Sequence, residues 1–211
     1  GGKYFVTRNQ SAIIAFKVSR KDYSGFHIAA SHSDSPTLKI KESSEMNIEN
    51  QYVKLNVEKY GGMLCAPWFD RPLSVAGRII VKDGNRLTTK LINVDRDLLM
   101  IPNLAIHMNR EVNDGYKYNI QKDMLPLYRM SNSGKAFKEM IAEEAGVSVD
   151  QIKGMDLFLY NRMEGTVWGC DGEFISAPRL DDLQCAFTST MALLNSESDR
   201  CIPVVAVFDN E

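Results

Sequence analysis

The chain has 211 residues, of which 44% are hydrophobic and 25% are charged, as in an ordinary globular protein. Its 25 basic and 27 acidic side chains give a net charge of −2, which argues against a general role in binding nucleic acid or acidic membranes. No apolar run approaches the roughly 18 residues of a membrane-spanning helix, and four dispersed cysteines without a CxxC pair argue against a zinc ribbon or disulfide scaffold and favour a reducing cytoplasm.

The first part of the chain predicts strands. Residues 4–6 and 12–18 are rich in β-favouring side chains and flank a polar turn, so they predict a hairpin. Residues 26–30 form an almost wholly apolar run, which is typical of a strand buried on both faces. This run ends at His32 and Asp34, two residues that can handle metal ions or protons.

The middle of the chain, residues 39–170, predicts an inserted α+β module with a mainly antiparallel sheet. Apolar residues alternate over 52–57, and Asp83-Gly84 between two β-favouring runs predicts a hairpin. Residues 109–133 are polar and turn-rich, so we expect a long loop there.

One amphipathic helix is predicted within this module. Apolar residues at 137, 140, 141 and 145 have helical spacing, with Ser133 as the expected N-cap and Gly146 as the expected C-terminal residue. A further strand is expected over 156–160.

The end of the chain returns to an α/β pattern. A short strand is expected at 174–177, a helix with an apolar stripe over 183–194, and an apolar strand at 202–208. The predicted fold is therefore an α/β layer with a partial, mostly parallel sheet, formed by 1–38 and 171–211. The antiparallel module at 39–170 interrupts it.

Three apolar segments end in residues that bind metals or protons, and functional groups collect at the carboxyl ends of parallel strands. An imidazole with several carboxylates suits Zn²⁺, Mn²⁺ or Co²⁺, and a bridging aspartate can hold two such ions about 3.5–4 Å apart. The three groups are His32 with Asp34, Asp181 with Asp182, and Asp209 with Glu211.

Each group also has an ordinary structural interpretation. A histidine two residues before an aspartate is most often a turn feature. Asp181 and Asp182 precede a helix, whose N-terminus favours carboxylates. Asp209 and Asn210 are a common turn pair. The functional hypothesis therefore depends on the three groups recurring at the same kind of position.

Six stretches, in order and over nearly the whole chain, resemble the aspartyl aminopeptidase family of dinuclear metallopeptidases. They are GGKYFVTRN at 1–9, ASHSDSP at 30–36, YGG at 60–62 with WFDRPL at 68–73, IPNLAIH at 101–107, APRLDD at 177–182, and FDNE at 208–211.

The resemblance implies roles for individual residues. His32 matches a metal-ligating histidine, Asp34 the carboxylate that orients it, and Asp181 the aspartate that bridges both metals. Glu211 matches the general base. His107, which reads as structural from its apolar surroundings alone, matches a histidine presented to the active site of a neighbouring subunit.

The resemblance also implies a catalytic domain at 1–38 and 171–211 and a dimerisation domain at 39–170. It implies two divalent ions, zinc first with cobalt or manganese as alternatives, and a peptide substrate cleaved at its N-terminal residue, acidic in the family preference. The expected assembly is a homo-oligomer, a dimer that builds a dodecamer, located in the cytoplasm without nucleic-acid or membrane partners.

Two further hypotheses stay open. Family members are roughly twice as long, so we expect a piece truncated at both ends that lacks the remaining metal ligands. Such a piece could act only as a non-catalytic dimerisation or interaction module. A related metal-dependent deacylase that shares the His-x-Asp pattern is the third hypothesis.

Overall fold

The computed structural model describes residues 2–19, 21–197 and 200–210, which form two compact units. The first unit comprises 1–35 and 165–211, and the second comprises 36–164. Within the described residues, no helix is long and apolar enough to cross a membrane.

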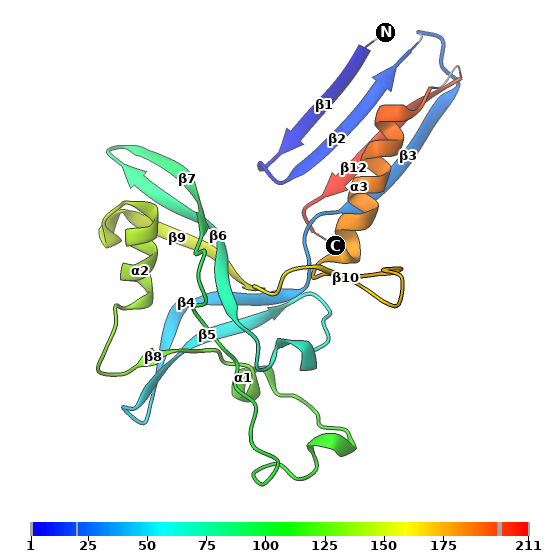
Figure 1. Cartoon of the computed structure of the whole chain (residues 1–211). Coiled ribbons are helices and arrows are strands. Elements are labelled where there is room, and N and C mark those ends of the chain that lie inside the picture. Colours follow the sequence, from blue (N-terminus) through cyan, green and yellow to red (C-terminus); the bar gives the residue numbers. More distant parts are fainter. Residues whose placement is uncertain (1, 20, 198–199, 211) are drawn as a thin grey trace. The chain divides into compact units, whose positions relative to one another are not determined.

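The first unit contains a four-stranded mixed sheet in the order β1-β2-β12-β3 (Figure 1). The predicted N-terminal hairpin is confirmed, and its second strand pairs antiparallel with β12, which in turn pairs parallel with β3. The helix α3 packs against β3 and β12. The elements of this unit are β1 (Gly2–Arg8), β2 (Ala12–Val18), β3 (Gly25–His32), β10 (Thr166–Trp168), β11 (Phe174–Ser176), α3 (Leu180–Asn195) and β12 (Cys201–Phe208).

Two predictions about burial in the first unit are wrong. Strand β3 is not buried on both faces, because Phe26 and Ile28 are 56% and 67% exposed. The predicted apolar stripe of α3 is also largely exposed, with Phe187 at 66%, whereas Leu193 is buried. Ala186 packs against the small buried cluster of Leu193, Val205 and Val207.

The second unit contains a six-stranded sheet in the order β7-β6-β9-β4-β5-β8, in which every pairing of described strands is antiparallel. The predicted α/β layer with a separate antiparallel sheet is thus confirmed. The elements of this unit are β4 (Thr37–Ile48), β5 (Tyr52–Tyr60), η1 (Ala66–Trp68), β6 (Leu73–Asp83), β7 (Arg86–Asn93), η2 (Val112–Asp114), α1 (Ile120–Asp123), β8 (Leu127–Met130), α2 (Phe137–Ala145), η3 (Val149–Gln151) and β9 (Ile152–Asn161).

The alternation in β5 buries one face of that strand, since Val53, Leu55 and Val57 are at most 3% exposed. The predicted hairpin between β6 and β7 is confirmed, with Gly84 at a φ of 57° in its turn. Glycine adopts this left-handed conformation without steric cost, which explains why the chain reverses here.

Two local predictions for the second unit need correction. Residues 109–133 are not one loop, because they contain α1 and the edge strand β8, which pairs with β5. Ser133 does not cap α2. The cap is at Ala136, whose backbone N–H donates to the carboxylate of Glu139 at 3.0 Å. Gly146 ends the helix with a φ of 63°, as expected.

Candidate metal centre

His32 lies at the end of β3, and its two ring nitrogens face different residues: Nδ1 faces Asp34, and Nε2 faces Asp181. Its Nδ1 lies 3.1 Å from the backbone oxygen of Asp34 and 3.2 Å from the Asp34 carboxylate. If Nδ1 carries the proton that it donates to Asp34, Nε2 has a free lone pair, which is the tautomer that binds metal. The predicted pairing of these two residues is therefore present in the structure.

Asp181 supplies a second oxygen donor close to this ring. Its Oδ1 lies 3.7 Å from His32 Nε2, and its side chain is 95% exposed. Two ligands with bonds of about 2.0–2.2 Å to one zinc ion can be separated by this distance. The nitrogen and oxygen donors thus fit a divalent transition metal, and the open side chain of Asp181 leaves both carboxylate oxygens accessible.

Asp182, the residue after Asp181, also contacts His32. Its Oδ2 accepts a hydrogen bond from the backbone N–H of His32 at 3.0 Å and lies 3.8 Å from Nε2 of the ring. The peptide bond between Asp181 and Asp182 is cis.

These contacts change the proton affinities of the cluster. Hydrogen bonds from the Cys185 thiol and the His32 N–H lower the pKa of Asp182, and that carboxylate raises the pKa of Cys185. Burial lowers the pKa of His32, but the hydrogen bonds and charge of Asp34 together with the charge of Asp182 outweigh it, and the net shift is upward. The carboxylates surrounding His32 therefore favour a cation at this position.

The segment before Asp181 differs from the prediction. The short strand β11 pairs with β10 in a separate two-stranded sheet and does not join the sheet of β3 and β12. Asp181 and Asp182 reach His32 from the start of α3, where their φ and ψ angles are not helical. The expectation that three neighbouring strand ends converge therefore holds for β3 and β12 only.

The ends of β3 and β12 do meet, as predicted. His32 is aligned with Phe208 in the parallel pairing, and the backbone N–H of Ser33 donates to the carbonyl of Phe208 at 2.8 Å. Glu211, the predicted general base, lies outside the described residues. Over residues 2–19, 21–197 and 200–210, no group of three or more histidine, cysteine, aspartate or glutamate side chains is placed to hold a metal ion.

His107 belongs to the second unit, on an exposed loop that follows Ile101. The base of this loop is held by Asp70, whose carboxylate accepts hydrogen bonds from the backbone N–H of Asn103 at 2.9 Å and from its side-chain amide at 3.1 Å. Two of the sequence stretches, WFDRPL and IPNLAIH, are thereby joined in the structure.

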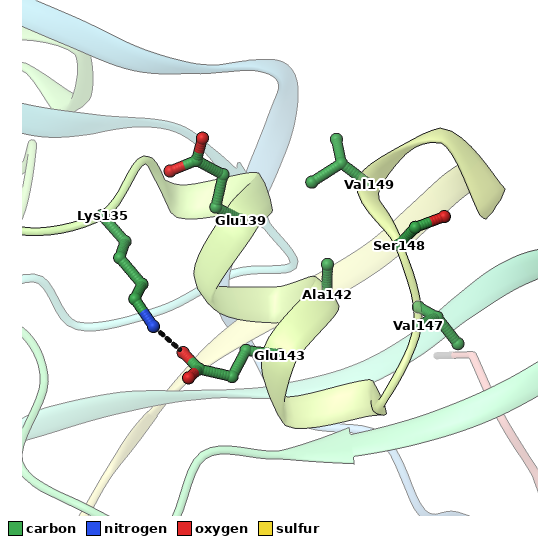
Figure 2. Close-up of a pocket in the computed structure, with 7 residues that line it drawn as sticks. All are labelled: Lys135, Glu139, Ala142, Glu143, Val147, Ser148 and Val149. Atoms are coloured by element: carbon green, nitrogen blue, oxygen red, sulfur yellow. Dashed lines mark hydrogen bonds and ion pairs between the residues drawn. The ribbon is translucent and has the colours of Figure 1, made fainter.

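An open hollow beside α2, also in the second unit, contains none of the predicted site residues. Figure 2 shows its lining, in which Lys135 and Glu143 form an ion pair of 2.6 Å. Glu139 and Val147 line it further. Its lining has no imidazole or thiol.

The whole chain, residues 1–211, matches the family model of the aminopeptidase I zinc metalloprotease (M18) family. The chain belongs to the M18 family. A probable M18 family aminopeptidase 2 of Clostridium acetobutylicum is 48% identical over 219 residues, and the match covers 100% of this chain and 50% of that protein.

Solved structures agree with this membership. The structure of Chaetomium thermophilum mApe1 is 36% identical with a TM-score of 0.85, over 100% of this chain and 52% of that one. The structure of the S. cerevisiae mApe1 dodecamer is 26% identical with a TM-score of 0.78, over 100% of this chain and 50% of that one. This M18 chain thus spans about half the length of the relatives that it matches.

Sequence reasoning grouped Asp182 with Asp181 but did not predict its contact with His32. The hydrogen bond that Asp182 accepts from the His32 backbone joins segments far apart in the sequence. Cys185 is exposed, and the Asp182 carboxylate raises the pKa of its thiol. The one local signal is their spacing, because a side chain at an N-cap commonly accepts from the N–H three residues later.

Proposed function

We propose that the protein containing this chain is a metallo-aminopeptidase that removes N-terminal residues from peptides. The observation that carries the proposal is the pair formed by His32 Nε2 and Asp181 Oδ1, 3.7 Å apart, with Asp34 holding the opposite ring nitrogen of His32. Carboxylate support of this kind is typical of metal-ligating histidines. Membership of a zinc metalloprotease family supports zinc as the metal.

In this proposal His32 and Asp181 would hold two divalent ions, with Asp181 as the ligand common to both. Bound ions of this kind supply Lewis acidity and lower the pKa of water. Glu211 takes the proton from the attacking water as general base. His107 of a neighbouring copy donates a hydrogen bond to the carbonyl oxygen of the scissile peptide bond.

We further propose that residues 1–38 and 171–211 belong to the catalytic domain and that 39–170 form an inserted dimerisation domain. The separate compact unit at 36–164 supports this division. The dodecamer of S. cerevisiae mApe1 supports a homo-oligomer here, built from dimers. A preference for acidic N-terminal residues and a cytoplasmic location complete the proposal.

Hydrolysis of aminoacyl anilides by the zinc-loaded, full-length protein tests this function. We expect turnover of substrates with a free α-amine, fastest with aspartyl or glutamyl residues, and none of their N-acetylated forms. Turnover of the N-acetylated forms alone would support a deacylase instead. Equal rates for neutral and acidic residues would remove only the substrate preference.

Replacement of the general base is the sharper test. Glu211→Gln should lower kcat by about 10²–10⁴-fold, because the amide cannot accept the proton, while zinc content and assembly stay unchanged. Glu197→Gln, an exposed acid in the same unit, is the matched control and should keep wild-type turnover. Activity of Glu211→Gln within a few fold of wild type would contradict the assignment.

A non-catalytic role for residues 1–211 by themselves is the alternative. It is favoured by the observation that the described residues bring two donors together at His32 and no set of three. Residues 1–211 expressed alone would then associate with one another without hydrolysing anilides, and the full-length protein would restore turnover. Turnover by residues 1–211 alone would exclude this alternative.

A further inference from the structure

Asp182 is placed at the junction between the strand that carries His32 and the helix that follows Asp181. Its carboxylate accepts the backbone N–H of His32 at 3.0 Å and is only 15% exposed, in contrast to the open side chain of Asp181. Asp182 itself stands at the start of α3, directly before the regular turns of that helix. Its side chain therefore ties the start of α3 to the backbone of β3 at His32.

The geometry of β3 explains why the His32 N–H needs this partner. The next N–H along the chain, that of Ser33, points to β12 and donates to the Phe208 carbonyl. Successive N–H groups of a strand point to opposite edges, so the His32 N–H points away from β12. Among the described strands, β3 is the last in the order β1-β2-β12-β3. On the side of β3 away from β12, the Asp182 carboxylate accepts the His32 N–H.

A simpler explanation is that Asp182 merely caps α3. Asp182 precedes the regular turns of α3, and aspartate is among the preferred N-caps. Capping alone, however, does not account for the hydrogen bond to His32, which comes from another element of the sheet. Serine caps helices about as well as aspartate but has a shorter side chain, so the two roles are separable by substitution.

We propose that Asp182 is a positioning residue of the metal centre: its carboxylate holds the backbone of His32 against the start of α3 and thereby sets the gap between His32 Nε2 and Asp181 Oδ1. This inference rests on the proposed metal site. Groups that orient metal ligands commonly contribute about 10–100-fold in metal affinity when they are removed.

The test compares zinc affinity of Asp182→Ser and Asp182→Asn in the full-length protein, by competition with a chromophoric chelator. Asp182→Ser retains the helix cap but cannot reach His32, so we expect about 10–100-fold weaker zinc binding. Asp182→Asn keeps an oxygen acceptor of the same length, so we expect binding within a few fold of wild type. The absorption spectrum of the cobalt-loaded protein should change in Asp182→Ser and be preserved in Asp182→Asn.

Each contrary outcome overturns the inference. Zinc binding by Asp182→Ser equal to wild type would leave capping as the only role. Equal weakening in Asp182→Asn and Asp182→Ser would show that the negative charge matters and not the hydrogen bond. Glu139→Ala, which removes the carboxylate bonded to the start of α2, is the matched control for a lost helix cap and should lower stability without changing zinc affinity.

If the proposed metal site is wrong, the variants should give a different result. His32→Ala should remove zinc binding if the proposed function is right. If His32→Ala binds zinc as tightly as wild type, the metal site is wrong. If His32→Ala loses zinc and Asp182→Ser does not, the metal site stands and the positioning role is wrong.

Discussion

The two units of the chain differ in how they are stabilised and in what chemistry they carry. The second unit has an extensive core in which Leu38, Leu73 and Leu157 are completely buried. The buried core of the first unit centres on Leu193, Val205 and Val207, and many of its other apolar side chains are exposed. Yet the first unit contains the cluster around His32. Its site is held by hydrogen bonds at element ends, whereas the second unit is held by packing.

The largest expected effect is on the chemistry of the first unit. If the proposed function is right, His32→Ala should remove zinc binding and abolish anilide hydrolysis, because it deletes the only imidazole of the described cluster. Metal content measured by elemental analysis checks this. The unfolding midpoint of the metal-free protein should not change, since the His32 side chain adds little to the buried core. A large drop in that midpoint would contradict the contrast between the two units.

Core truncation should affect stability in the second unit far more than in the first. Phe137 is completely buried and packs edge-on against Tyr128, so Phe137→Ala should cost about 3–5 kcal/mol of unfolding free energy. Phe187 is 66% exposed, and Phe187→Ala should change it by less than about 0.5 kcal/mol. Denaturant unfolding measures both. Equal costs would show that the exposed face of α3 is covered in the full-length protein.

His107→Phe tests whether the second unit contributes to catalysis without binding metal. Loss of a hydrogen-bond donor to the oxyanion should lower kcat by about 10²–10³-fold. Zinc content should stay at the wild-type value, because the proposed role of His107 is to donate a hydrogen bond to the substrate carbonyl and not to bind metal. Loss of zinc in this variant would mean that His107 binds metal. Metal binding would then not be confined to the first unit.

A smaller effect than that of core truncation is predicted at the end of α2. Gly146 has a φ of 63° and no atom within 4 Å of the position that a Cβ would take, so Gly146→Ala should cost about 1 kcal/mol from backbone conformation alone. Gly62 has equally open surroundings without a positive φ, and Gly62→Ala should be nearly neutral. The difference between the effects of Gly146→Ala and Gly62→Ala on the unfolding free energy measures the cost of the left-handed backbone conformation at Gly146.

Much of the fold was predictable where the signal is local. The alternation in β5, the Asp83-Gly84 hairpin and the helix ending at Gly146 all depend on neighbouring residues, and all three are confirmed. Ser133 failed as a cap because the chain between it and α2 offers a better start, at Ala136 with Glu139 three residues later. Burial of β3 and α3 was mispredicted because apolar composition does not specify which face another element covers.

The sequence by itself predicted the membership of this chain in its family and the pairing of His32 with Asp34, and both are confirmed. Asp181 as the second metal donor stays a prediction. Only the tertiary structure decided that Asp181 arrives from a helix start and not from a sheet strand, and that Asp182 binds the His32 backbone. The reason is physical. Donor types and local turns are properties of short segments, whereas distances between donors are set by strand pairing and helix packing between segments far apart in the chain.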